Sequence, residues 1–310
     1  MLNKILQKIE KYQSIVLFRH VFADMDAIGS QFGLKQWIQD TYPDKQVYAL
    51  GDASKTSMNA GVKMDIVEDE IIKESLAIIL DTSNGARVED DRYTMAKESI
   101  RIDHHVHVES FCDLEWIDDK ACATCEMIAQ FLEYHKQKLS SVCANLLYAG
   151  MIADSIRFSV SSVRKESLLS AAYLLPFGVD VVKIEQMNFS STYADFQYEA
   201  IVKSKAVRKE KFLYSILEVE DYQKCNQSFS SAKEKVYALS GVDSIELWAL
   251  FTRMDDGIHY SASLRSKKVS VREIATAFGG GGHVCACGIK NLTRDQLDQI
   301  IEECMKQSLL

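Results

Sequence analysis

The sequence predicts an α/β fold in two domains, the first with a mostly parallel sheet flanked by helices and the second smaller. Short apolar runs alternate with amphipathic stretches over the first half of the chain, which is the pattern of βαβ units. A separate set of strand and helix patterns follows a polar stretch near residue 200. The length of 310 residues, with 47% hydrophobic and 26% charged residues, suits two globular domains.

The first half is predicted to hold strands in four apolar runs, at 14–18, 46–50, 76–80 and 99–103. Apolar residues at helical spacing predict helices at 1–13, 27–40, 124–137, 141–154 and 165–177. Because helices follow or separate the strands, we expect parallel pairing with helical crossovers.

The second half is predicted to begin with a polar, helix-like connector. The chain is therefore divided into a first domain at 1–185, a connector at 186–207 and a second domain at 208–310. Within the second domain, residue patterns predict strands at 211–219, 244–254 and 258–266, helices at 271–278 and 293–307, and a turn at the glycine run 279–283.

Composition narrows the class of partner. A formal net charge of -8 disfavours a protein that grips duplex DNA through its phosphates, so a nucleic-acid substrate should be short. No apolar run approaches the ~20 residues of a membrane span, and the amino terminus lacks the apolar core of a secretory signal. We therefore expect a cytoplasmic protein without a membrane partner.

The eight cysteines fit reduced thiols better than a disulfide framework in a chain without an export signal. A thiolate metal site is a weaker alternative, because structural zinc usually needs paired ligand knuckles at tighter spacing. Its candidate ligands would be Cys122, Cys125, Cys285 and Cys287.

Acidic and histidine residues gather just past three predicted strands, where parallel α/β sheets place their ligand sites. A single aspartate there is often only a cap or turn residue, and a single histidine is more often structural. Together they form the mixed nitrogen and oxygen set that borderline divalent metals prefer. The residues are His20, Asp24 and Asp26 after the first strand, Asp81 after the third, and Asp103, His104 and His105 at the fourth.

Charge arithmetic favours two divalent cations at this edge. Asp154, at the end of a predicted helix, adds a fourth carboxylate to those of Asp24, Asp26 and Asp81. Four negative charges match two divalent cations, and histidines add neutral nitrogen ligands. Without cations the carboxylates would repel one another.

A glycine-rich segment in the second domain predicts an anion site. The glycines at 279–282 allow close backbone approach and can offer N–H groups to an anion, although alone they could form a flexible loop. Arg265 can grip a phosphate through its guanidinium fork, and His283 follows the glycines. These two residues favour phosphate or base binding.

Six motifs, in this order, resemble the bacterial branch of the DHH phosphoesterase superfamily, in which a DHH domain precedes a DHH-associated domain. That branch includes oligoribonucleases of very short RNA, phosphatases of 3'-phosphoadenosine-5'-phosphate (pAp), and phosphodiesterases of cyclic di-AMP or its linear product pApA. The resemblance implies an active site in a cleft between two domains. The motifs are H-x-x-x-D-x-D-A-x-G-S at 20–30, D-T-S-N-G-A-R at 81–87, D-H-H at 103–105, A-G-x-x-x-D-S-x-R-F at 149–158, S-L-R-S at 263–266 and G-G-G-G-H at 279–283.

The resemblance also implies residue roles. One ion would be held by His20, Asp24 and Asp81, and the other by Asp26, Asp81, His104 and Asp154. Mn²⁺ is the expected metal, with Mg²⁺ and Co²⁺ as alternatives. Asp103 and His105 would act in catalysis, with His105 on the scissile phosphate. The nucleotide would be held by Arg265, Ser266, Gly280, Gly281, Gly282 and His283.

The resulting prediction is a two-metal phosphodiesterase of short linear nucleotides such as pApA or very short RNA, with pAp and cyclic di-AMP as further candidates and a homodimer as one possible assembly. Three alternatives stay open: an inorganic pyrophosphatase of family II, a processive exonuclease, and a catalytically weak nucleotide sensor. The sensor alternative rests on departures from the family pattern, since Met25 and Ile156 replace small residues near the ligands and Ala23 replaces a proline.

Overall fold

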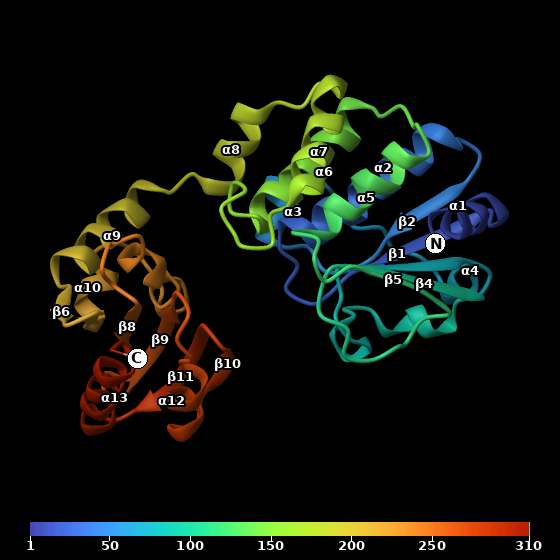
Figure 1. Ribbon diagram of the computed structural model, residues 1–310. Helices are drawn as coiled ribbons and strands as arrows, with labels where there is room; N and C mark the ends of the chain where they lie inside the picture. The colour runs from blue at the N-terminus through green and yellow to red at the C-terminus, as the bar shows by residue number, and fades with distance from the viewer. Residues whose placement is uncertain (310) are drawn as a thin grey trace. The chain divides into compact units, whose positions relative to one another are not determined.

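The computed structural model describes residues 1–309 and divides the chain into two compact units after Ser190. Both units are α/β, which confirms the predicted fold class (Figure 1). The first carries a five-stranded sheet and the second a six-stranded sheet. The predicted connector at 186–207 contains the end of α8 (Val181–Phe189) and all of α9 (Tyr193–Ser204).

The sheet of the first unit is parallel throughout, in the order β2-β1-β3-β4-β5. The four predicted strands are present, whereas β5 was missed because its residues are only half buried and show no apolar run. Since β1, β3 and β4 are neighbours, their carboxyl ends meet at one edge. The strands are β1 (Ser14–Phe18), β2 (Gln46–Ala49), β3 (Leu76–Leu80), β4 (Glu98–Asp103) and β5 (Leu114–Ile117).

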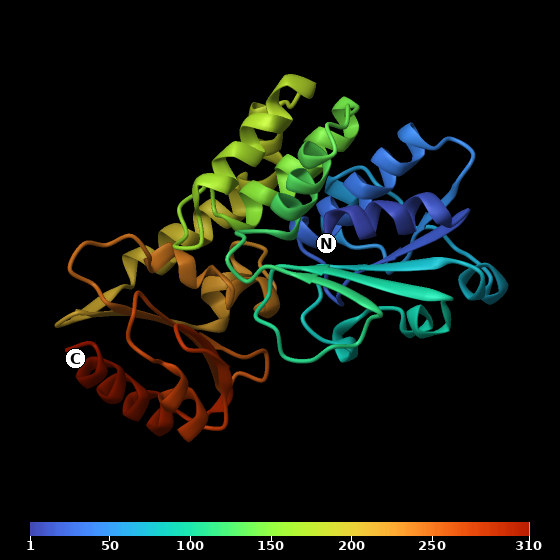
Figure 2. The same cartoon turned by 45° about the vertical axis from the view of Figure 1, so that its right-hand side comes forward.

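Long helices cover one face of this sheet and short segments cover the other (Figures 1 and 2). Alternation along β1 shows the division, because Ile15 and Leu17 belong to the larger core while Val16 and Phe18 pack with α4 on the opposite face. The long helices are α1 (Leu2–Lys11), α2 (Met25–Thr41), α5 (Thr124–Tyr134), α6 (Ser141–Asp154) and α7 (Lys165–Leu174). The short segments on the other face are α4 (Asp69–Lys73), η1 (Gly85–Arg87) and η2 (Asp91–Met95). The remaining two short segments pack with the long helices, α3 (Lys55–Asn59) against α2 and η3 (Leu175–Phe177) against α6 and α7.

Glycines let α2 and α6 cross very closely. A Cβ placed on Gly29 would lie 2.5 Å from the Leu146 carbonyl oxygen, and one on Gly150 would lie 2.9 Å from the Met25 carbonyl oxygen. Neither distance is tolerated by ordinary van der Waals packing, so a side chain at either position would push the helices apart. The crossing brings the start of α2 up to the end of α6, where Asp154 lies.

The second unit has a mixed sheet in the order β10-β11-β9-β8-β7-β6. Its strands are β6 (Val207–Lys209), β7 (Phe212–Leu217), β8 (Leu247–Arg253), β9 (Tyr260–Ser266), β10 (Gly281–His283) and β11 (Ala286–Leu292). Its other elements are α9, α10 (Val219–Gln223), α11 (Phe229–Ala232), η4 (Lys235–Leu239), α12 (Arg272–Ala277) and α13 (Arg294–Gln307).

The prediction of a turn over the whole glycine run was wrong. Residues Gly281–His283 form β10, which pairs antiparallel with β11. Glycine has no side chain to show strand alternation, and here it permits close strand approach, since a Cβ on Gly282 would lie 2.8 Å from the Cα of Cys287.

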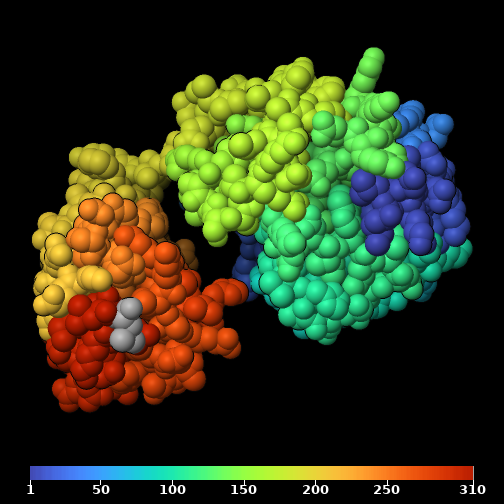
Figure 3. All heavy atoms as spheres, in the orientation of Figure 1, coloured from blue at the N-terminus to red at the C-terminus, as the bar shows by residue number. Residues whose placement is uncertain are grey.

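Within residues 1–309, no single helix has the length and apolar character needed to cross a membrane. One bent pair, Lys165–Phe177 with Val181–Phe189, meets those two criteria only when taken together, across a bend of 120°. Much of the surface of the first unit in the space-filling view comes from this part of the chain, coloured yellow-green (Figure 3).

Candidate active site

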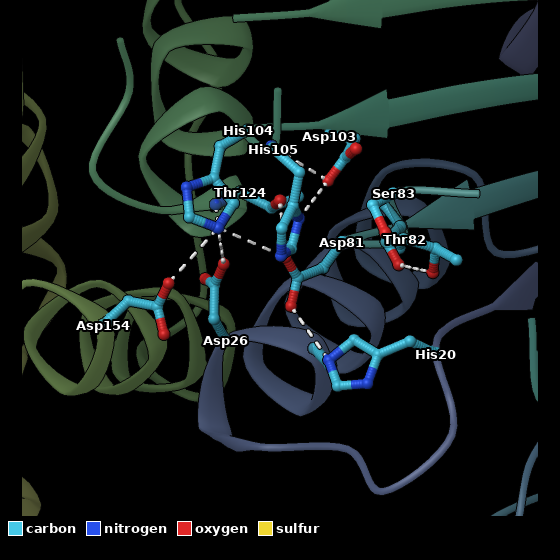
Figure 4. A network of polar contacts seen from close by, with 12 residues as sticks. His20, Asp26, Asp81, Thr82, Ser83, Asp103, His104, His105, Thr124 and Asp154 are labelled. Atoms are coloured by element: carbon cyan, nitrogen blue, oxygen red, sulfur yellow. Dashed lines mark hydrogen bonds and ion pairs between the residues drawn. The ribbon is translucent and has the colours of Figure 1, made fainter. Parts of the chain in front are cut away.

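Side chains from several separate segments of the first unit converge on one small region (Figure 4). His20 lies just after β1, Asp81 directly after β3, and His104 directly after β4. These strands are neighbours, so the parallel sheet itself brings the three residues to one edge. The helix crossing of α2 and α6 adds Asp26 and Asp154 from two helix ends.

Asp81 stands at the centre of the group. Its Oδ2 lies 3.4 Å from Nε2 of His20, and its Oδ1 lies 3.4 Å from Nε2 of His104. The Thr124 hydroxyl donates a hydrogen bond of 3.2 Å to the same Oδ1. The side chain is 2% exposed. One buried carboxylate thus offers an oxygen to each of two histidines.

The potential ligand atoms fall into three overlapping groups, each with its atoms within 4.8 Å of one another. The six residues predicted as metal ligands are all brought together here, and their assignment to two ions stays a prediction. Within residues 1–309 none of these groups contains a cysteine, so the thiolate alternative gains no support. The groups are His20, Asp24 and Asp81; Asp26, His104 and Asp154; and Asp81, His104 and His105.

Backbone carbonyls orient both central histidines. Nδ1 of His20 lies 2.7 Å from the Val21 carbonyl oxygen, and Nδ1 of His104 lies 3.2 Å from that of Ala121. A carbonyl oxygen can only accept, so each Nδ1 carries the hydrogen and each Nε2 turns toward the carboxylates. This is the orientation in which histidine binds a metal through Nε2, and the donor set therefore fits divalent cations.

The pKa values of His104 and Asp26 also indicate that this cluster of carboxylates favours additional positive charge. Burial alone would lower the pKa of His104, but its contacts with Asp154 and Asp81 raise that pKa to about 12. Burial, together with the charges of Asp81 and Asp154, raises the pKa of Asp26 well above its ordinary value. Both shifts show that added positive charge stabilises this group, and divalent ions could supply that charge in place of protons.

Two of the carboxylates are fixed by helix amino termini. Asp26 is fully buried and accepts hydrogen bonds from the backbone N–H groups of Thr124, at 2.6 Å, and Cys125, at 2.9 Å, where α5 begins. Asp24 caps α2 and accepts from the N–H groups of Asp26 and Ala27. Sequence reasoning missed Thr124, because nothing in the sequence shows that α5 starts beside the site.

Two buried residues, Arg101 and Asp103, support the partly exposed ring of His105. The guanidinium of Arg101 lies 2.5 Å from Oδ2 of Asp103, and Oδ1 of Asp103 lies 2.7 Å from Nδ1 of His105. Burial would raise the pKa of Asp103, but its bonds to His105 and Arg101 keep that pKa below its ordinary value. The charged Asp103 therefore fixes the His105 ring. Arg101 was missed because an arginine in a strand is expected to be exposed to solvent, whereas this one is fully buried.

Of the three residues that depart from the family pattern, Met25 and Ala23 are buried and Ile156 is exposed. The side chain of Met25 is 7% exposed and belongs to the hydrophobic core of the first unit. Ile156 is 52% exposed and begins three consecutive residues with positive φ, at 45°, 59° and 59°. Ala23 is buried in the same core as Met25. Met25 thus packs with the core.

The predicted nucleotide-binding residues of the second unit are only partly collected in one groove of about 640 Å³. Arg265 lines it together with Gly279–Gly282, Ser261, Ser263 and Lys233. Ser266 and His283 are not among the lining residues. The Ser266 hydroxyl donates to the Val269 carbonyl at 2.5 Å, because alternation along β9 turns it to the opposite face from Arg265.

Two family models match the chain, one within each of its two structural units. The description "DHH family, N-terminal domain" matches residues 14–151, and the description "DHHA1 domain" matches residues 211–307. A solved structure of an exopolyphosphatase-related protein from Bacteroides fragilis superposes with a TM-score of 0.86 at 22% identity, covering 98% of this chain and 95% of that chain. The two proteins share a fold.

Curated relatives extend over the whole chain. The sequence is 32% identical to a probable bifunctional oligoribonuclease and PAP phosphatase of Streptococcus mutans, over 96% of each protein. It is 29% identical to the bifunctional oligoribonuclease and PAP phosphatase of Bacillus subtilis, over 98% of this chain and 97% of the relative. A cyclic-di-AMP phosphodiesterase of Geobacillus thermodenitrificans is 24% identical over 95% of this chain but only 47% of its own length.

Proposed function

Because this chain belongs to the DHH family of phosphoesterases, we propose that it is a two-metal phosphodiesterase that cleaves short linear nucleotides, such as pApA or very short RNA, to mononucleotides. The observation that carries the proposal is the buried carboxylate of Asp81, which lies 3.4 Å from Nε2 of both His20 and His104. A carboxylate between two metal-oriented histidines is suited to bridge two cations.

The residues that would hold the ions follow from the observed groups. One ion would take His20, Asp24 and Asp81, and the other Asp26, His104 and Asp154 with Asp81 shared. We propose Mn²⁺, because the set mixes imidazole nitrogens with carboxylates. When bound, two such cations neutralise phosphoryl charge and lower the pKa of water.

His105 would position the scissile phosphate. Asp103 holds its Nδ1, and within residues 1–309 no hydrogen bond occupies its Nε2. The ring is partly exposed, with 37% of its side chain accessible, so a substrate can reach it. In its protonated form, Nε2 would donate a hydrogen bond to a phosphoryl oxygen and stabilise the charge that develops there.

The second unit would hold another part of the nucleotide. Arg265 can pair with a phosphate, and the open backbone of Gly281, where an added Cβ would meet nothing within 4 Å, leaves room for a ligand. Sequence similarity favours linear over cyclic substrates, since the chain is 32% identical to the oligoribonuclease relative of Streptococcus mutans and 24% identical to the cyclic-di-AMP phosphodiesterase. The bifunctional names of the relatives make pAp a second candidate substrate.

The cysteines support a cytoplasmic location as part of the proposal. All eight are free, and six of them are buried. Free thiols persist in a reducing compartment, whereas an exported chain with this many cysteines would usually carry disulfides.

The test is hydrolysis of pApA, a five-nucleotide RNA, pAp and cyclic di-AMP, with Mn²⁺ and after chelation, followed by chromatography of the products. We expect mononucleotides from pApA and RNA only with metal. Asp81→Asn should abolish hydrolysis, while Asp295→Asn, the same charge change in the first turn of α13, should not. Binding of a nucleotide without any product would refute the enzyme proposal and favour the sensor.

A further inference from the structure

An aromatic side chain between two candidate metal ligands in the sequence is exposed to solvent. Phe22 lies between His20 and Asp24 and is 94% exposed. Single exposed hydrophobic residues are common on protein surfaces, so exposure alone assigns no role. The ring nevertheless contributes nothing to the core, since it belongs to none of the hydrophobic clusters of the first unit.

The backbone of Phe22 supplies a second, independent observation. Its φ is 58°, in the left-handed region that bulky side chains rarely adopt and that glycine adopts without steric cost. Because the ring is exposed and does not pack in the core, burial of its apolar surface does not explain why phenylalanine occupies this strained position. Residues held in this region cluster at functional sites.

The loop that carries Phe22 is held on both sides. The Val21 N–H donates to the Arg87 carbonyl at 2.9 Å, and His20 forms an isolated antiparallel bridge with Val88. On the other side the Asp24 side chain caps α2. The conformation at Phe22 is therefore fixed by its neighbours and does not depend on packing of its own ring.

Chain geometry keeps the backbone of Phe22 close to that of two candidate ligands, His20 and Asp24. Consecutive Cα atoms are about 3.8 Å apart, so the Cα of Phe22 lies within roughly 7.6 Å of those of His20 and Asp24. Nε2 of His20 and Oδ2 of Asp24 are themselves 3.9 Å apart. A nucleobase joined through its ribose to a phosphate at this centre falls within reach of the ring.

We propose that Phe22 is a specificity-determining residue on which a nucleobase of the substrate stacks, so that the first unit itself selects nucleotides over phosphoesters that lack a base. The inference rests on the proposed phosphodiesterase function. Bases stack on exposed aromatic side chains of single-strand-binding proteins, and this contact tolerates any base because every base has a π-face. Purines, with the larger face, should be preferred at this position.

The experiment compares F22A and F22W with the wild type on pApA and on two analogues of pApA, each lacking one of the two bases. We expect kcat/KM on pApA to fall by roughly 5- to 100-fold in F22A, the range of a lost stacked base, and to stay close to wild type in F22W. On the analogue that lacks the stacked base, F22A and the wild type should turn over alike. F22G should lose activity as F22A does without any fall in Tm, because glycine suits the left-handed backbone.

If F22A lost the same factor in kcat/KM on pApA and on both analogues, the loss would show a structural role and would overturn the proposal. Unchanged kcat/KM of F22A on pApA would overturn it as well. If the wild type turns over none of these nucleotides, the proposed function fails separately. Equilibrium binding of pApA to the wild type and F22A then decides the role of Phe22, since a stacking residue must contribute to affinity. Equal affinities would overturn the inference.

Discussion

Replacing Gly150 by alanine should damage the proposed metal centre without changing any of its proposed ligands. A Cβ at this position would lie 2.9 Å from the Met25 carbonyl oxygen and 3.0 Å from the Cα of Asp26, and would also overlap the sulfur of Cys125. Two of these three atoms are backbone and cannot rotate away. The substitution therefore has to move α6 from α2, and with it Asp154 from Asp26.

The size of the effect follows from two opposing terms. Overpacking a close contact costs about 1–3 kcal/mol, and backbone contacts place Gly150→Ala near the upper end. Alanine returns about 1 kcal/mol through its better helix propensity. The net loss of about 2 kcal/mol should lower Tm by roughly 4–8 °C in a unit of this size. A ligand displacement on the order of 1 Å should reduce kcat/KM by about 100-fold.

A matched control lies along the same helix pair. A Cβ on Gly33 would lie 2.7 and 2.8 Å from two side-chain carbons of Leu147, which can rotate away. Gly33→Ala should therefore change Tm by less than Gly150→Ala and leave Mn²⁺ affinity near the wild-type value. The double variant C125A/G150A removes one of the three overlaps and should recover part of the lost stability.

The assay combines thermal unfolding, Mn²⁺ titration and hydrolysis of pApA by each variant. Wild-type Tm and Mn²⁺ affinity in Gly150→Ala would refute the view that the glycine crossing sets the distance between Asp26 and Asp154. Equal effects of Gly150→Ala and Gly33→Ala would also refute it, because the distinction between backbone and side-chain neighbours would then have no consequence.

Three further predictions concern the charges of the site. Mn²⁺ should raise the Tm of the wild type by mass action and should raise that of Asp81→Asn much less, as thermal unfolding with and without chelator will show. In the presence of chelator, the stability of the fold should fall as pH rises from about 6.5 towards 12. The reason is that the pKa of His104 is raised to about 12 in the folded protein, so its contribution to stability is complete below its ordinary pKa and is lost as pH rises towards the folded-state pKa. With Mn²⁺, Tm should instead rise over pH 6 to 8, since metal binding releases protons. Arg101→Met should lower kcat by roughly 10- to 100-fold, because it removes the contact with Asp103. The control Arg92→Met, which removes a surface ion pair, should leave kcat unchanged. Equal activity of the two variants would show that Arg101 does not help to position His105.

Much of the first unit could be predicted because its chemistry follows from strand ends. An apolar run that stops at Asp81, and another that stops at Asp103, are visible in the sequence, and parallel sheets place such ends together. Sequence order does not, however, give strand order. Only the structure shows that β1, β3 and β4 are neighbours, which is what makes three separate motifs into one site.

The missed features share one physical cause, which is that they depend on tertiary neighbours. Arg101 in a strand carries no sign that Phe111 will stack against its guanidinium at 4.8 Å or that Asp103 will pair with it. Gly281–His283 shows no alternation because its glycines have no side chains. Thr124 contacts Asp81 only because α5 begins at the site. Local patterns cannot contain such information.

Backbone strain at the site explains why asparagine is the informative replacement for Asp81. The φ of Asp81 is 52°, so its backbone turns sharply where β3 ends, and this turn presents the carboxylate to both histidines. Alanine would remove the charge and also strain the left-handed backbone, whereas asparagine adopts that conformation readily. If Asp81→Asn keeps the chelated Tm of the wild type but loses the Mn²⁺ response, the loss belongs to the ligand oxygen. A large fall in chelated Tm would instead show that the carboxylate stabilises the fold even without metal.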